Sequence, residues 1–177
     1  MFRKWPTFCL LILIAVLVTG PAVHAQNSSE LYGGYKTSDE TALDDEFIFG
    51  FRNSTFFSDN AAIEFAFGFS SVGLQFQDAE VAGDLITLDI STLYFPTSNE
   101  FFFFGGAGWA DSKFDIKLPA GTAGGYEDSL TANLGLGWRI PFAQKGYLRP
   151  EARARWYESS SIIDVEVSLA IGFGFRR

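Results

Sequence analysis

Charged residues that recur at every second position are the groups in this sequence best placed to act together. Segment 149–155 alone carries four of them, Arg149, Glu151, Arg153 and Arg155. Side chains two residues apart in a β-strand lie on one face, so these charges would share a surface and could form a network of ion pairs. Five arginines and five acidic residues lie in segments of this kind, at positions that alternate with apolar residues: Glu46, Arg52, Glu64, Asp89, Arg139, Arg149, Glu151, Arg153, Arg155 and Glu166.

Other chemistry finds little support in the sequence. Its one histidine, His24, falls in an N-terminal segment that we expect to be removed, so no imidazole would remain as a general base. The acidic clusters 39–40 and 44–46 lack the ligand spacing and the glycine of a calcium loop. Paired glycines such as Gly106 and Gly108 have no helix behind them to complete a phosphate cradle. We therefore predict no enzyme, no metal site and no cofactor.

The first 25 residues have the order of features of a cleavable signal peptide. Arg3 and Lys4 precede an apolar run of 11 residues from Phe8 to Val18, and a small-residue cleavage site ends at Ala25. The apolar run is too short to span a bilayer. Residues 26–177 would then form one mature domain with 11 basic and 21 acidic residues and no cysteine. Such an acidic domain is not expected to bind nucleic acid.

Apolar and polar residues alternate with a period of two along most of this domain, as they do in β-strands whose two faces differ. Two segments, 31–37 and 101–110, show the pattern with interruptions. Six segments show it clearly: 46–52, 63–70, 86–94, 130–139, 148–156 and 165–175. Eight strands are therefore predicted.

The connections between these segments differ in length in a regular way. The longer ones are 38–45, 71–84, 111–129 and 158–164, and the shorter ones are 53–60, 96–100 and 141–146. Long connections at one end and short turns at the other are typical of an up-and-down antiparallel barrel in a membrane.

Alternation alone does not say which face of the barrel is inside. A soluble lipocalin-like barrel has its apolar face inside, whereas a transmembrane barrel has it outside. Here the apolar face is uncharged, and the opposite face has few lysines for a soluble surface. Aromatic residues near strand ends would form the girdles found at membrane interfaces: Tyr94, Trp109, Trp138, Trp156 and Phe175. We predict a transmembrane barrel and keep a soluble periplasmic ligand-binding barrel as the third alternative.

The charged face would then line a lumen that eight strands leave just wide enough for side chains. Each ion buried there needs a partner, and Glu64 and Glu166 are the candidates to balance the arginines of 149–155. We favour a structural ion-pair network, and a gate or narrow path for ions is the alternative. Pro150 has no amide hydrogen for a strand ladder, so we expect it near the periplasmic rim or at a bulge.

Together these features resemble the small outer-membrane β-barrel proteins of Gram-negative bacteria, the OmpA/OmpX-like class. The resemblance covers the mature chain and includes the run from Phe104 to Ala110, the opening of segment 148–151 and the closing segment 169–175. It implies an all-β fold, a closed eight-stranded antiparallel up-and-down transmembrane barrel, inserted in the outer membrane by the barrel-assembly machinery.

Two classes of function remain for such a barrel. We expect a structural or surface-interaction protein whose acidic loops meet lipopolysaccharide, divalent cations or other surfaces. A porin-like narrow channel for small solutes or ions is the alternative. Outer-membrane lipid and lipopolysaccharide are the expected surroundings, and the oligomeric state is left open.

Overall fold

The computed structural model describes residues 27–38, 46–76, 79–96, 100–118 and 121–174. The predicted signal peptide and Phe175 lie outside these residues. The strands are β1 (Asn27–Ser38), β2 (Glu46–Phe56), β3 (Ala61–Phe76), β4 (Ala79–Tyr94), β5 (Phe101–Leu118), β6 (Gly121–Trp138), β7 (Ile140–Pro141), β8 (Gly146–Tyr157) and β9 (Ile163–Phe173). Within the described ranges, no helix is long and apolar enough to cross a membrane.

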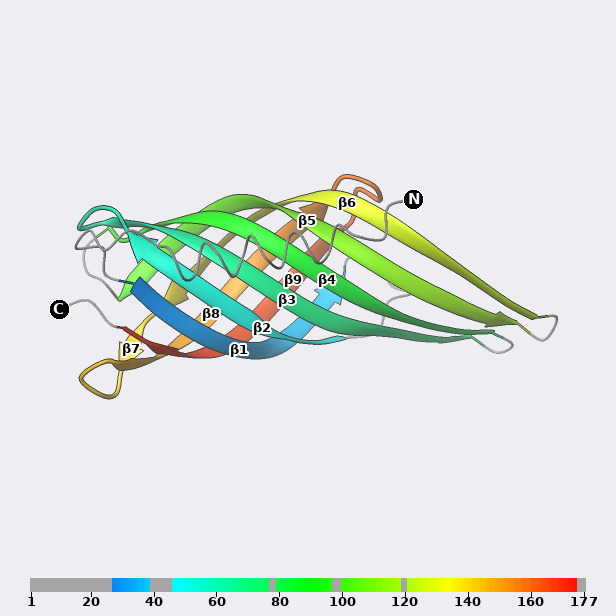
Figure 1. Cartoon of the computed structure of the whole chain (residues 1–177), viewed down its shortest axis with the longest axis horizontal. Coiled ribbons are helices and arrows are strands. Elements are labelled where there is room, and N and C mark those ends of the chain that lie inside the picture. Colours follow the sequence, from blue (N-terminus) through cyan, green and yellow to red (C-terminus); the bar gives the residue numbers. More distant parts are fainter. Residues whose placement is uncertain (1–26, 39–45, 77–78, 97–99, 119–120, 175–177) are drawn as a thin grey trace.

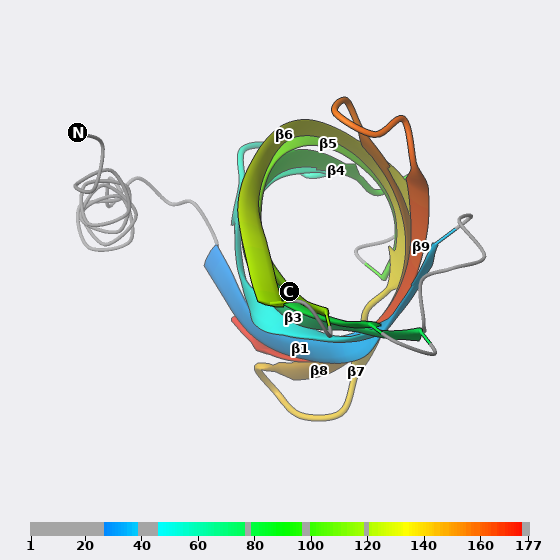
Figure 2. The same cartoon turned by 90° about the vertical axis from the view of Figure 1, so that its right-hand side faces the viewer.

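The strands form one closed antiparallel sheet. Neighbours in the chain pair from β1 to β6, while β9 pairs with both β1 and β8. A further pairing between β6 and β8 closes the sheet, and the strands make a ring when viewed along the barrel (Figure 2). Because β7 has only two residues and lies in line with β6, the predicted barrel of eight strands is confirmed.

Pro150 lies opposite the interruption that separates β6 from β7. The ladder between β6 and β8 ends at Gly137 and resumes at Ile140 of β7 in the same register. Pro150 of β8 therefore falls opposite Trp138, where it has no amide hydrogen to donate to the ladder. The interruption is at the end of the barrel that carries the short turns.

Two hairpins are longer than the alternation predicts. The β3–β4 and β5–β6 ladders run to the hairpin tips, whereas loops are predicted over 71–84 and 111–129. Both hairpins project beyond the rest of the barrel (Figure 1). The sequence over 113–118 does alternate. Its charged residues are at odd-numbered positions, however, and earlier in β5 the odd-numbered positions include the apolar residues Phe103 and Trp109. This reversal of polarity concealed the strand.

The barrel wall has an apolar outer face and a charged inner face. Leu134 and Val167 are 67% and 60% exposed, whereas Glu64 and Arg149 are 1% and 0% exposed. Each of the eight long strands presents at least one large exposed apolar side chain on its outer face. This is the arrangement of a transmembrane barrel, so the alternative with an apolar interior is wrong.

Candidate functional site: the ion-pair network of the lumen

The lumen holds a network of ionised side chains that runs along β8. The inner positions of β8 are Arg149, Glu151, Arg153 and Arg155, and strands β1, β2, β3, β4 and β9 supply charges that face them. All ten residues predicted for the network are at most 5% exposed. Period-two alternation places them together because every second residue of each strand points into the barrel.

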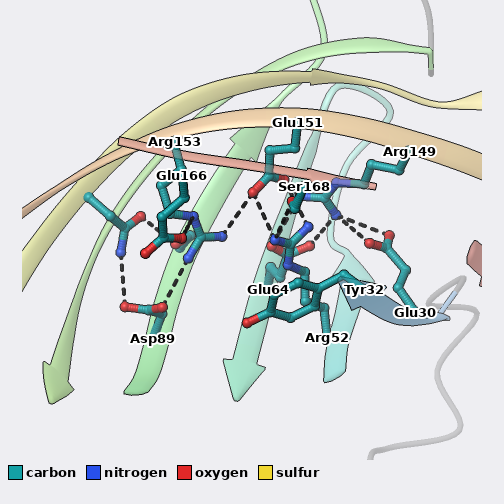
Figure 3. Close-up of polar contacts among 12 residues, drawn as sticks. Glu30, Tyr32, Arg52, Glu64, Asp89, Arg149, Glu151, Arg153, Glu166 and Ser168 are labelled. Carbon is teal, nitrogen blue, oxygen red and sulfur yellow. Dashed lines mark hydrogen bonds and ion pairs between the residues drawn. The ribbon is translucent and has the colours of Figure 1, made fainter. Parts of the chain in front are cut away.

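Arg149 is the centre of this network (Figure 3). Its Nη1 lies 2.9 Å from Glu30 Oε2, and its guanidinium also donates to Glu64 and Glu151. The hydroxyl of Tyr147 donates to Glu30 at 2.6 Å. One guanidinium group therefore contacts three carboxylates, which come from β1, β3 and β8 itself.

Arg52 reaches Glu151 from the other side of the lumen (Figure 3). Its Nη2 lies 3.0 Å from Glu151 Oε1, and its guanidinium carbon lies 3.9 Å from the centre of the Tyr32 ring, a favourable cation–π distance. Gly50 and Gly68 make room for that ring, because a Cβ atom on either would meet the Tyr32 hydroxyl at 2.6 Å.

Arg153 and Arg155 continue the network towards the projecting hairpins. Asp89 of β4 accepts hydrogen bonds from both, at 2.9 and 2.6 Å. Glu166 of β9 lies 3.3 Å from Arg155 and 3.8 Å from Nε of Arg153. The two acids nominated from the sequence, Glu64 and Glu166, are thus both placed against arginines of β8.

Three further buried charges were missing from the sequence prediction: Glu30, Lys36 and Asp164. Lys36 Nζ lies 2.9 Å from Glu46 and 3.2 Å from Asp164. Glu30 and Asp164 lie just beyond the segments that the alternation defines, and Lys36 lies in the glycine-interrupted segment 31–37. Each is in phase with lumenal residues of its strand. Extending the two predicted segments by one position would have found Glu30 and Asp164, and following the phase through the glycines would have found Lys36.

Aromatic rings fill the lumen at the short-turn end. Phe56, Phe95, Phe102 and Phe104 belong to one buried apolar cluster, here called the aromatic plug. The Arg139 guanidinium carbon lies 5.1 to 5.9 Å from the ring centres of the first three. The alternation of the sequence did not indicate these inward-facing rings. Four consecutive phenylalanines at 101–104 conceal that alternate ones point inwards.

Ion pairs and rings leave little free space inside the barrel. A cavity towards the projecting hairpins, lined partly by Tyr32, Lys36 and Arg155, has a volume of about 10 Å³, the minimum for one water molecule. The arrangement can therefore tie the strands together across the lumen, and this cavity between described residues is too small for a substrate.

Four of the five predicted aromatic girdle residues are described, and all four lie on the outer face. Tyr94, Trp138 and Trp156 are 54%, 52% and 41% exposed, and Trp109 is half-buried. The register places Tyr94 and Trp138 beside the short turns and Trp109 and Trp156 towards the projecting hairpins. Aromatic side chains at these two levels fit the two interfaces of a membrane.

The fold, its orientation and the filled lumen define a small transmembrane β-barrel protein. The chain matches the family model described as outer membrane protein beta-barrel domain over residues 9–176. It belongs to this family of outer-membrane barrels. No curated protein matches the chain significantly.

Solved structures of outer-membrane proteins share the fold at low sequence identity. A major outer membrane protein from Thermus thermophilus is 12% identical, with a TM-score of 0.66 over 86% of this chain and 100% of that one. Ail, the attachment invasion locus protein of Yersinia pestis, is 12% identical, with a TM-score of 0.63 over 85% and 97%. OprG from Pseudomonas aeruginosa is 12% identical, with a TM-score of 0.53 over 86% and 98%. At this identity the likeness concerns the fold alone.

Proposed function

We propose that this protein is a non-conducting outer-membrane barrel with a structural or surface-interaction role. The observation that carries the proposal is the filled lumen, in which Arg149 ties together carboxylates from three strands and the aromatic plug occupies the short-turn end. The barrel then serves as a rigid support, and the β3–β4 and β5–β6 hairpins are the parts that meet the exterior.

The proposal includes the surroundings of the barrel. Outer-membrane lipid and lipopolysaccharide would contact the apolar outer face, after export by the signal peptide 1–25 and insertion by the barrel-assembly machinery. We assign no catalytic role, because the predicted mature chain has no histidine and its buried acids are engaged by arginine or lysine.

The alternative, a narrow channel for ions or small solutes, requires the lumenal contacts to open. We expect the folded protein to give no discrete conductance steps in planar bilayers, and Arg153→Ala to give none either, because the neighbouring ion pairs and the aromatic plug still close the lumen. Val167→Ala, on the lipid face, is the matched control for the effects of mutation, purification and refolding. An open porin is the positive control, because its conductance shows that inserted protein is detected. Reproducible steps in the wild type whose size changes in Arg153→Ala would contradict the proposal and favour the channel.

A further inference from the structure

Lys36 and Asp164 bring a primary amine and a carboxyl group together on the first and last strands of the barrel. β1 and β9 pair directly, with Lys36 opposite Glu166 and Ser38 opposite Asp164. Lys36 and Asp164 are therefore diagonal neighbours on the lumenal face, within reach of a long side chain. Lys36 Nζ lies 3.2 Å from Asp164 Oδ2, so the carboxyl carbon of Asp164 is one covalent bond beyond an atom that the amine already contacts.

A second carboxylate touches the same amine. Glu46 of β2 lies directly opposite Lys36, and its Oε2 is 2.9 Å from Lys36 Nζ. The Ser70 hydroxyl donates a hydrogen bond to the same oxygen at 3.4 Å. Glu46 is thus held against the amine from the side of β2, while Asp164 contacts it from β9. One carboxyl group can therefore be attacked by the amine while the other carries a proton.

Lys36 differs chemically from the other buried cations of the lumen. Those described are Arg52, Arg139, Arg149, Arg153 and Arg155. A guanidinium stays protonated in proteins, whereas a lysine amine becomes a nucleophile once it has lost its proton. Among the cations that the structure places in the lumen, Lys36 is therefore the one able to form a covalent bond with a carboxyl group.

Water has little access to these three side chains. Lys36, Glu46 and Asp164 are 7%, 5% and 3% exposed. The buried apolar residues Ile48 and Leu85 line the small cavity that Lys36 also borders. Charges are disfavoured in such surroundings, so they favour the conversion of an ammonium and a carboxylate into neutral groups. The cavity, with a volume of about 10 Å³, also has room for one released water molecule.

We propose that the side chains of Lys36 and Asp164 condense to an amide after the barrel has folded, with Glu46 as the proton carrier. Lys36 Nζ first gives a proton to Asp164 Oδ2 and becomes a neutral amine, whose lone pair attacks Asp164 Cγ. Glu46 then takes a second proton from the nitrogen and passes it to the departing oxygen. The Nζ–Cγ bond forms, one Cγ–O bond breaks, and the oxygen leaves with both protons as water. No oxidant, reductant or cofactor takes part.

The fold supplies what this condensation lacks in free solution. Two groups held in contact within one molecule react as if they were extremely concentrated, and here the pairing of β1 with β9 holds them. The amide would join the first strand to the last one, where the barrel closes. A link between residues far apart in the chain restricts the unfolded state, as a disulfide does, and the predicted mature chain has no cysteine to form one. The reaction goes beyond the proposed function, because it modifies the chain itself and needs no partner.

The intact mass of the protein before and after folding tests the reaction. We expect the denatured chain to have its full mass and the barrel folded in detergent to become lighter by the mass of one water molecule. Lys36→Arg keeps the positive charge but not the nucleophile, so it should keep its full mass after folding. Lys113→Arg makes the same change at an exposed lysine and should lose water like the wild type.

Two further variants and a digest test the chemistry. Asp164→Asn should release ammonia instead of water, which changes the mass difference in a predictable way. Glu46→Gln keeps the size of the side chain but cannot carry the proton, so we expect condensation to be about a hundredfold slower. Tandem mass spectrometry of a protease digest of the wild type should identify one branched peptide, in which Lys36 is joined to Asp164.

Four results would overturn the inference: a folded wild type that keeps its full mass, a loss of water in Lys36→Arg, condensation of Glu46→Gln at the wild-type rate, or a branched peptide that joins other residues. Gel mobility before and after heating checks that each variant is folded. If Lys36→Arg does not fold, the mass of the folded wild type and its branched peptide decide the question alone. Bilayer conductance is measured separately and bears only on the proposed function.

Discussion

Arg149→Met is expected to destabilise the folded barrel by about 3–5 kcal/mol, or to prevent refolding, because it leaves buried carboxylates without their cation. Glu30 and Glu64 are both fully buried against Arg149, and methionine can fill the space without answering their charge. The measurement is urea unfolding in detergent or lipid vesicles, followed by tryptophan fluorescence and by gel mobility.

Two comparisons separate this charge effect from a general loss of packing. Lys145→Met removes an exposed cation from the turn before β8, and we expect little change in the free energy of unfolding. Adding Glu64→Gln to Arg149→Met removes one of the stranded charges and should recover part of the loss. If Arg149→Met unfolds at the same urea concentration as the wild type, the network does not stabilise the barrel in the way we describe.

Leu134→Arg is expected to cost about 2–4 kcal/mol, the effect of an arginine that faces lipid near the middle of a bilayer. Leu134 is 67% exposed on the outer face of β6. It lies halfway between Leu130, which pairs with Trp109, and the girdle residue Trp138. Urea unfolding in lipid vesicles measures the effect.

The matched control for this substitution is Leu130→Arg on the same strand. Leu130 is 62% exposed, but it is level with Trp109, where an arginine reaches the interface and costs only about 0–1 kcal/mol. Equal losses at both positions would show that the aromatic residues do not mark the membrane boundary. No loss at Leu134 would show that this face does not meet hydrocarbon.

The orientation of the barrel could be predicted from the sequence because its two faces differ in kind over the membrane-spanning segments. In β9, for example, Val165, Val167 and Leu169 alternate with Glu166 and Ser168, and a strand has only two ways to place them. The charge balance and the shortage of lysine then decide between these two ways.

The sequence failed to predict the inward-facing rings and the projecting strands because there the two faces do not differ in polarity as they do in the rest of the barrel. Phe102 and Phe104 are as apolar as Phe101 and Phe103, so alternation could not show that they close the lumen. The projecting part of β5 lies beyond the level of Trp109, and its charged residues are at the alternate positions that carry apolar residues earlier in the strand. Which residues form ion pairs depends on the register between strands, and the turns help to set that register. The sequence could therefore nominate Glu64 and Glu166 but could not assign their partners.

Spin labels on single cysteines along β9 test the central claim most directly, since the predicted mature chain has no cysteine of its own. Cysteines at Val167, Ser168, Leu169 and Ala170 cover two periods of the in-and-out alternation of the strand. The rate at which a spin label collides with dissolved oxygen reports its contact with lipid. We expect high oxygen accessibility at 167 and 169 and low accessibility at 168 and 170. High accessibility at 168 and 170, or no alternation at all, would contradict a barrel whose apolar side faces the membrane and whose ion pairs fill its interior.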